Sequence, residues 1–260
     1  MRWTKLLTNM RFNIISSGSK GNTSVVIYKK TAILIDMGVS FQCLENGLQE
    51  MGLTVEDLSA AIFTHNHSDH ISGIRFLSPK IMYGLDGTLP GTLSNVVELN
   101  KEFQIGDIFI TPFKTSHDAT NPCGFLLKGG EETLVYMTDT GCFLEENLSL
   151  IKNPTYLVIE SNHDIKMLLA TKRTYELKNR ILSDVGHLCN EDSAIAATQI
   201  IGRDTKEIIL AHLSEEANTP ELALAAYLKI FKHFGINSDN YLIRCAHQHH
   251  STIGGHEDEN

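Results

Sequence analysis

Four residues of types that bind metal ions lie within six positions of one another, in the segment His65-Asn66-His67-Ser68-Asp69-His70. The segment follows the apolar run 60–64, which has the composition of a buried strand. Alternate residues of an extended chain point the same way, so His65 and His67 can hold one metal ion together. Asp69 and His70 come next, where we expect the chain to turn into a helix. Their side chains form a second pair of ligands that points away from the first pair. A chance polar loop is disfavoured, because each buried side chain would need its own partner.

Two adjacent metal ions would need at least three or four further ligands, together with a carboxylate that bridges the like charges. Candidates occur where other strand-like runs end: His117 in Ser116-His117-Asp118, Asp139 in Thr138-Asp139-Thr140, and His212 in Ala211-His212-Leu213. The sequence therefore predicts a centre assembled from loops that are far apart in the chain.

A second pair of residues has the chemistry of proton transfer. Glu160 ends the strand-like run 155–160, and His187 precedes a helical segment. A carboxylate that orients a histidine is a common arrangement for a general acid. A capping or core histidine is the alternative interpretation of His187, and for His163 that alternative is equally favoured.

These residues need elements that position them. Runs rich in β-branched and aromatic residues predict strands in the first half, and strands alternate with helices in the second half. The predicted strands are 11–16, 24–29, 31–36, 60–64, 107–113, 124–128, 133–138, 155–160, 206–211 and 241–246; the predicted helices are 163–181, 191–202, with Asn190 as N-cap, and 219–234. This order favours an α/β fold of the αββα sandwich type, with two mixed β-sheets packed face to face and flanked by helices.

The composition is that of an ordinary globular protein, with 260 residues, 42% hydrophobic and 20% charged. The 22 Lys and Arg against 31 Asp and Glu give a formal net charge of −9, which disfavours DNA and anionic membranes and favours a small-molecule enzyme. No apolar run of about 18 residues occurs, so we expect no membrane span. Five cysteines without a C-x-x-C pair predict no disulfide-linked partner and a cytoplasmic location.

The chain shows no repeat and no long linker, so we expect one domain over residues 10–246. Residues 247–260 are polar and rich in histidine, and we expect a flexible tail. A metal site within that tail is the less favoured interpretation.

The segment His65–His70 matches the H-x-H-x-D-H motif of the metallo-β-lactamase superfamily, which the chain resembles over nearly its whole length. The resemblance implies that His65, His67 and His117 bind one divalent metal ion, that Asp69, His70 and His212 bind a second, and that Asp139 bridges the two. Asp36 resembles the early strand-end aspartate that supports the ligand loop of this superfamily, with a simple turn carboxylate as an equal alternative.

Glu160 and His187 are similar to the Glu–His pair of the phosphodiesterase branch, in which the histidine protonates the departing oxygen. Only about seventy residues separate Asp139 from His212, which excludes the long inserted domain of the mRNA-cleavage branch.

A closer resemblance is to the YycJ/WalJ branch of small bacterial nucleases. It rests on residues 17–22, 64–73, 116–118, 160–164, 177–182, 186–190 and 211–214. Cys189 departs from the branch, which usually has a small hydroxyl residue there. The branch also tends to begin near the position of Met10, so the resemblance implies that residues 1–9 are an N-terminal extension, with Met10 as an alternative start to Met1. The matching stretches add candidates for substrate contact or for support of the ligands, namely Asn22, Asn162, His163, Lys178 and Arg180.

The resemblance implies a two-metal phosphodiesterase that hydrolyses nucleic acid and acts as a DNA exonuclease. Metal-bound hydroxide would attack phosphorus, and His187, oriented by Glu160, would protonate the leaving oxygen. Imidazole and carboxylate ligands suit Zn²⁺ and Mn²⁺.

The negative charge is an objection to a nucleic acid partner. A local cluster of cations weakens it: Lys166, Lys172, Arg173, Lys178 and Arg180, with Glu176 the only acid among them. A solvated helix face is an equal explanation of this cluster. Two other functions stay open, namely hydrolysis of a small phosphodiester, thioester or lactone, and a catalytically silent metal-binding protein.

Overall fold

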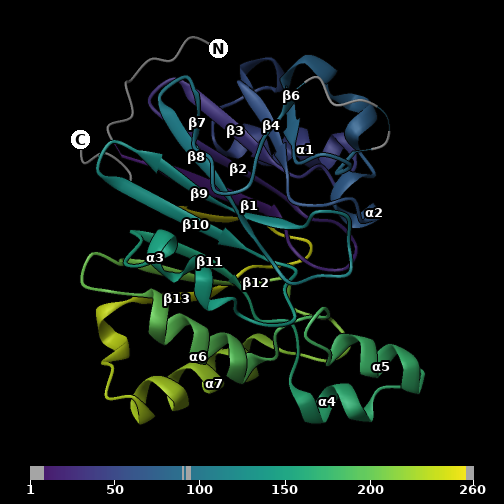
Figure 1. Cartoon of the computed structure of the whole chain (residues 1–260), viewed down its shortest axis with the longest axis vertical. Coiled ribbons are helices and arrows are strands. Elements are labelled where there is room, and N and C mark those ends of the chain that lie inside the picture. The colour runs from purple at the N-terminus through teal and green to yellow at the C-terminus, as the bar shows by residue number, and fades with distance from the viewer. Residues whose placement is uncertain (1–8, 90, 92–94, 256–260) are drawn as a thin grey trace.

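A computed structural model of the chain describes residues 9–89, 91 and 95–255. Two seven-stranded sheets pack face to face (Figure 1). In spatial order, the first sheet contains β14 (Thr252–Gly255), β1 (Arg11–Ser16), β2 (Thr23–Tyr28), β3 (Thr31–Ile35), β4 (Ala60–Phe63), β5 (Met82–Gly84) and β6 (Asn95–Val96). The second contains β13 (Leu242–Cys245), β12 (Glu207–Ala211), β11 (Tyr156–Glu160), β10 (Glu132–Met137), β9 (Cys123–Gly129), β8 (Ile108–Lys114) and β7 (Phe103–Ile105).

Both sheets are mixed. Strands β14, β1, β2 and β3 pair antiparallel, and β3 to β6 pair parallel. In the second sheet β10 to β13 are parallel, and β7 to β10 are antiparallel. The predicted αββα architecture of two mixed sheets is confirmed.

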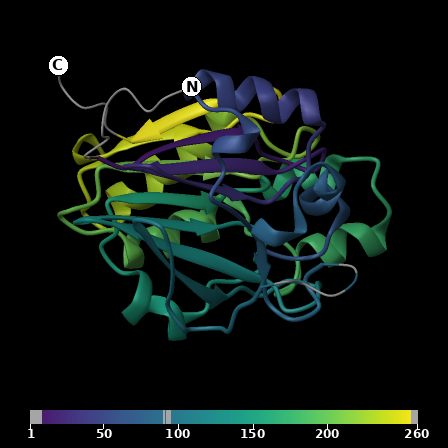
Figure 2. The same ribbon diagram turned by 90° about the horizontal axis from the view of Figure 1, so that it is seen from above.

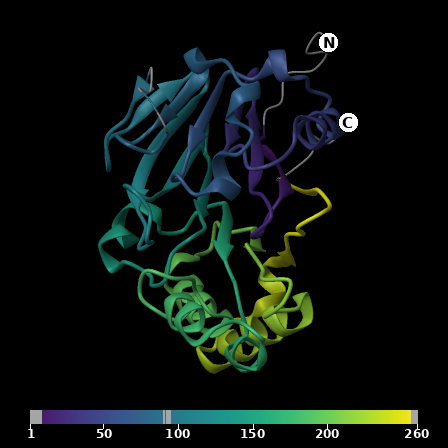
Figure 3. The same cartoon turned by 90° about the vertical axis from the view of Figure 1, so that its right-hand side faces the viewer.

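Helices cover the outer faces of both sheets, as the views from above and from the side show (Figures 2 and 3). Helix α1 (Phe41–Glu50) packs on the first sheet, and the short α2 (Ser68–Ile71) follows β4. Helices α3 (Leu148–Ile151), α6 (Asn190–Ile200) and α7 (Pro220–His233) cover the second sheet. Helices α4 (Ile165–Ala170) and α5 (Tyr175–Ile181) form a separate pair (Figure 1). Short 3-10 turns lie at Val55–Asp57, Ile74–Phe76, Pro79–Ile81, Glu145–Asn147 and Ser238–Asn240.

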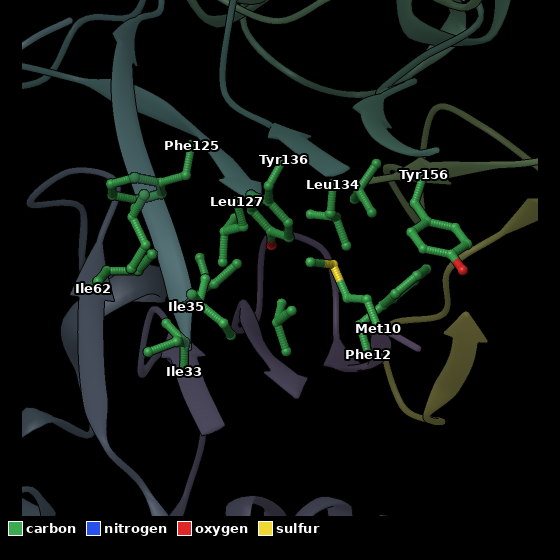
Figure 4. Close-up of a cluster of buried hydrophobic side chains, with 14 of the residues drawn as sticks. Met10, Phe12, Ile33, Ile35, Ile62, Phe125, Leu127, Leu134, Tyr136 and Tyr156 are labelled. Carbon is green, nitrogen blue, oxygen red and sulfur yellow. The ribbon is translucent and has the colours of Figure 1, made fainter. Parts of the chain in front are cut away.

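The alternation of side chains along each strand builds the core. Ile33 and Ile35 of β3 face the space between the sheets, where they join residues such as Phe12, Phe125 and Tyr136 (Figure 4). Ala32 and Leu34 face the other way and pack with α1. Because both faces of β3 are covered, all of its side chains are apolar or buried, and the strand reads as a continuous hydrophobic run.

Two predicted helices differ from the structure. The predicted helix 163–181 is two helices, because Thr171 ends α4 and the hydroxyl of Thr174 caps α5 by accepting a hydrogen bond from the Leu177 N–H. Helix α6 begins at Asn190, and its N-cap is Cys189 rather than Asn190. Helix α1 was not predicted.

The C-terminal segment also differs from the prediction of a flexible tail from residue 247. Thr252–Gly255 form β14, which pairs antiparallel with β1 at the edge of the first sheet. Arg244 donates a hydrogen bond to the Ile253 carbonyl (2.7 Å), and the Gly255 N–H donates one to Glu207 (3.1 Å). Residues 247–255 are therefore part of the framework. The extension predicted for residues 1–9, Asn9 apart, and residues 256–260 lie outside the described part.

Two further observations concern membrane spans and disulfides. Within the described residues, no helix combines the length and hydropathy that crossing a membrane requires. All five cysteines lie in the described part, and each is a free thiol.

Candidate metal centre

The candidate ligands and the carboxylates that support them come from the ends of strands that run in one direction. Asp36 follows β3, and Asp139 and His212 follow the ends of β10 and β12, while Glu160 is the last residue of β11. His65 follows β4 after one residue. Because these strands are parallel within each sheet, their carboxyl ends bring side chains distant in sequence to one edge of the sandwich.

The backbone at three of these strand ends has an uncommon conformation. Asp36, Asp139 and His212 have φ values of 58°, 55° and 56°, in the left-handed region that non-glycine residues rarely occupy. Strained backbone of this kind is concentrated at functional sites. The turn after each strand directs its side chain back over the edge of the sheet.

The first group of candidate ligands is His65, His67 and His117. One ligand atom from each residue lies within 4.8 Å of the others. His117 Nε2 is 3.1 Å from His67 Nδ1. Ligands about 2.0–2.1 Å from one tetrahedral ion lie about 3.4 Å apart, so the spacing suits a shared metal ion.

The second group is Asp69, His70 and His212, again with ligand atoms within 4.8 Å of one another. Asp69 Oδ2 lies 3.6 Å from His70 Nε2 and 3.9 Å from His212 Nε2. Two further sets of side chains also lie within 4.8 Å of one another, namely His65, His70 and Asp139, and Asp139, Glu160, His187 and His212, so the division of six ligands into two groups stays a prediction.

Asp139 lies between the two groups. Its Oδ1 is 3.7 Å from His117 Nε2, and its Oδ2 is 3.2 Å from His70 Nε2. Its side chain is almost completely buried. Burial opposes ionisation, but the neighbouring His212 and His70 hold the pKa of Asp139 well below its usual value. A buried carboxylate with one oxygen toward each group is suited to bridge two cations.

Hydrogen bonds donated by Nδ1–H orient three of the buried histidines. His70 Nδ1 lies 2.8 Å from Asp36, His117 Nδ1 lies 3.0 Å from the Gly186 carbonyl, and His212 Nδ1 lies 2.7 Å from Glu160. These acceptors receive hydrogen bonds from Nδ1–H, so Nε2 is the ring nitrogen that faces the other candidate ligands.

A test of the metal assignment is whether buried polar atoms lack partners where an ion would lie. His65 Nε2 and His212 Nε2 are both buried and have no hydrogen-bond partner among the described residues. Buried polar atoms without partners are rare, because burial without a hydrogen bond is costly. Burial also holds the pKa of His65 well below its usual value, which keeps it neutral. The donor set therefore fits divalent metal ions.

Asp36 holds part of the second ligand group in place through hydrogen bonds. It is completely buried, and it accepts hydrogen bonds from the Thr64 N–H and hydroxyl, both 2.8 Å, as well as from His70. It thus fixes both His70 and the backbone at the start of the ligand loop.

Glu160 and His187 are in direct contact. Glu160 Oε1 lies 2.9 Å from His187 Nδ1, and Oε2 accepts from the backbone N–H groups of Thr140 (3.0 Å) and Leu188 (3.1 Å). Burial raises the pKa of Glu160, but His187 and His212 lower it to about 2, so the carboxylate is ionised. One buried carboxylate therefore orients both His187 and His212.

Two asparagines support the ligands. The Asn22 amide nitrogen lies 3.1 Å from Asp69 Oδ2 and 3.0 Å from His70 Nε2. The Asn162 side chain donates to the His212 carbonyl at 2.8 Å. His163 is buried, neither of its ring nitrogens has a partner among the described residues, and burial lowers its pKa to about 4.

The two predicted cations have structural partners. Lys178 Nζ donates to the carbonyls of Leu169 and Thr171, so it holds α4 against α5. Arg180 makes a two-pronged ion pair with Asp118, with Nη2 2.7 Å from Oδ1. Asp118 Oδ1 in turn lies 3.6 Å from His117 Nε2, so Arg180 reaches the edge of the centre only through Asp118.

Sequence reasoning missed several supporting residues. Ser17 Oγ accepts a hydrogen bond from the His212 N–H at 2.8 Å. Gly38 is required by close approach, since a Cβ there would lie 1.6 Å from the Asp69 carbonyl oxygen. The only signal for either residue was its place in or beside a short loop after a strand.

The chain is similar to several known proteins. The family model described as the beta-lactamase superfamily domain matches residues 31–213. An exodeoxyribonuclease WalJ of Streptococcus pneumoniae is 36% identical over 230 residues, covering 82% of this chain and 85% of the relative. An exodeoxyribonuclease YycJ of Bacillus anthracis is 35% identical over 242 residues, covering 87% and 92%.

Solved structures show the same fold at lower identity. The metallo-beta-lactamase fold protein YhfI from Bacillus subtilis has a TM-score of 0.68 at 17% identity, covering 95% of this chain and all of its own. The short form of human tRNase Z has a TM-score of 0.63 at 14% identity, covering 93% and 98%.

Proposed function

This chain belongs to the beta-lactamase superfamily and is a metal-dependent hydrolase, and on that premise we propose that it is a two-metal phosphodiesterase that acts on DNA as an exonuclease. The relatives named as exodeoxyribonucleases support the substrate class. The observation that carries the proposal is the Glu160–His187 contact beside two groups of ligands that meet at Asp139. A metal-binding module has no need of a proton donor in that position.

In this proposal His65, His67 and His117 would hold one divalent ion, Asp69, His70 and His212 would hold the other, and Asp139 would contribute to both sites. Zn²⁺ and Mn²⁺ suit these donors. Two such ions supply a nucleophile at neutral pH and neutralise charge that develops on the phosphate.

The residues of the chain position the reaction. Glu160 is ionised and accepts a hydrogen bond from the His187 Nδ1–H, so the Nε2–H of the protonated ring is the donor that faces the substrate. We assign to His187 the donation of a proton to the oxygen that leaves phosphorus. General acid catalysis of this kind contributes about 10²–10⁴-fold to a rate.

The test is hydrolysis of single- and double-stranded DNA by protein reconstituted with Zn²⁺ or Mn²⁺. We expect His187→Ala to lower kcat about 10²–10⁴-fold with metal content unchanged. Asp69→Ala should lower both activity and metal content. His233→Ala is the matched control, since His233 is exposed on α7. Full activity of His187→Ala, or efficient turnover of a thioester or lactone without DNA hydrolysis, would contradict the proposal.

A further inference from the structure

A cavity of about 590 Å³ lies beside the centre, on the side of the second ligand group. Its lining includes Lys20, Arg75, His249 and the hydroxyl residues Ser40 and Ser72. None of its lining residues is acidic, although the chain carries a formal net charge of −9. This makes the cavity a local exception to the charge of the molecule.

The cavity is lined by segments that adjoin the second ligand group. Lys20 lies two residues before Asn22, whose amide contacts Asp69, and Ser72 lies one helical turn after Asp69. The Ser72 hydroxyl donates to the Gly38 carbonyl at 3.0 Å, and the Gly38 N–H donates to the Asn22 carbonyl at 3.0 Å. The three segments that hold Asp69 and His70 on one side therefore line the cavity on the other.

The chemistry of the lining suits an anion. Lys20 and Arg75 are exposed cations from different segments. Helix α1 begins at this cavity, with Ser40 as its N-cap and with no acidic residue in its first turn. Its positive end adds to the field of the two cations.

Each of these two cations already has a contact within the chain. Lys20 Nζ lies 2.6 Å from Glu215, which is outside the cavity lining, and both side chains are largely exposed. Exposed ion pairs contribute about 0–1 kcal/mol, so an incoming anion can compete with Glu215 for Lys20. Arg75 stacks on Phe76 at 4.7 Å, which orients its guanidinium.

We propose that this cavity binds a backbone phosphate of the nucleic acid strand, outside the metal centre, through Lys20 and Arg75. The proposal rests on the proposed function, because it assigns the cavity to the same substrate. A DNA strand with one phosphodiester at the metal centre would then also be held through a second phosphate of the same strand, which lies in the cavity. This provides DNA binding in an acidic protein without a basic surface.

The test measures binding of a fluorescent 12-nucleotide single-stranded DNA to metal-loaded protein in the His187→Ala background, over 50–300 mM NaCl. We expect Lys20→Gln/Arg75→Gln to weaken binding about 5–20-fold at 50 mM NaCl. The slope of log K against log salt should become shallower by about 0.7, since the variant loses one single-strand phosphate contact. Lys229→Gln/Lys232→Gln removes two exposed cations from α7 and should change binding less than twofold.

A gain of binding provides a second, independent readout. Glu215→Gln removes the competitor for Lys20, and we expect it to tighten binding about 2–5-fold. Glu131→Gln removes the same charge at the β9–β10 turn, at the opposite end of β10 from Asp139, and should have no such effect.

The outcomes separate this proposal from the proposed function. If Lys20→Gln/Arg75→Gln and Lys229→Gln/Lys232→Gln bind DNA equally well, the cavity assignment is wrong, even if the wild-type protein hydrolyses DNA. If the wild type hydrolyses no DNA but binding depends on Lys20 and Arg75, the proposed function fails and the cavity assignment stands. Equal losses for thymidine monophosphate and for the 12-nucleotide strand would mean that the cavity holds a free nucleotide, and would overturn the strand assignment.

Discussion

At the scale of single residues, the centre is organised by carboxylates that are not themselves in the ligand groups we assign. Asp36 orients His70, and Glu160 orients His212 and His187, in each case through Nδ1. Outer partners of this kind fix the tautomer and the ring orientation of a ligand. We therefore expect the affinity of the centre for metal ions to depend on residues outside the two ligand groups.

Asp36→Asn tests this dependence. Asparagine tolerates the left-handed backbone at residue 36, where φ is 58°, so the substitution removes the charge and leaves the turn. We expect the affinity for metal ions to fall about 10–100-fold, because His70 loses a charged acceptor. Titration of metal-loaded protein with a competing chelator measures this. Asp86→Asn, at an exposed position, is the control, and an equal affinity in the two variants would contradict the role of Asp36.

The sequence was most informative for residues whose side-chain type alone leaves few possible roles. A motif of three histidines and an aspartate in six positions has few explanations, and the structure brings those residues together with His117, Asp139 and His212. Lys178 and Arg180 were less predictable, because a cation serves equally well for a carbonyl, a carboxylate or a phosphate. Their partners depend on how α5 docks, which local sequence does not encode.

At the scale of elements, periodicity predicted the long buried strands and failed at boundaries and edges. β3 and β11 are continuous apolar runs covered on both faces. β14 is a short strand of Thr, Ile and two Gly residues, a composition that local propensity does not favour. Pairing with β1 creates it, and that contact spans almost the entire chain.

Ending the chain after residue 250 tests the contribution of β14. The change removes the pairing with β1 and the hydrogen bonds from Arg244 to Ile253 and from Gly255 to Glu207. At about 1 kcal/mol for each hydrogen bond, we expect the free energy of unfolding to fall by about 2–4 kcal/mol. Denaturation by urea measures the change. A chain ended after residue 255 is the control, and equal stability of the two shortened chains would show that β14 contributes nothing.

At the scale of the whole molecule, net charge was a poor guide to the substrate. In the predicted cluster, Arg173, Lys178 and Arg180 have partners within the chain, as Lys20 of the cavity has in Glu215. A charge count averages the whole surface, whereas a bound strand experiences the field of one edge. The cavity with Lys20 and Arg75 places positive charge beside the centre without altering that count.

The centre also joins the two halves of the sandwich. His65 and His70 follow strands of the first sheet, whereas Asp139 and His212 follow strands of the second. Metal ions that bind the folded chain and not the unfolded one stabilise it by an amount set by their concentration and affinity. At 100 times the dissociation constant this is about 2.7 kcal/mol.

One ion bound at this concentration contributes about 2.7 kcal/mol, so removal of the two metal ions should lower Tm by about 5–10 °C for each ion at the conversion usual for chains of this size. Thermal scans of reconstituted protein with and without a chelator measure the shift. The double variant His65→Ala/His212→Ala lacks one ligand from each group, so the chelator should move its Tm far less. If the chelator lowers both Tm values equally, the stabilising ions bind elsewhere, and the two sheets are held together by their apolar core alone.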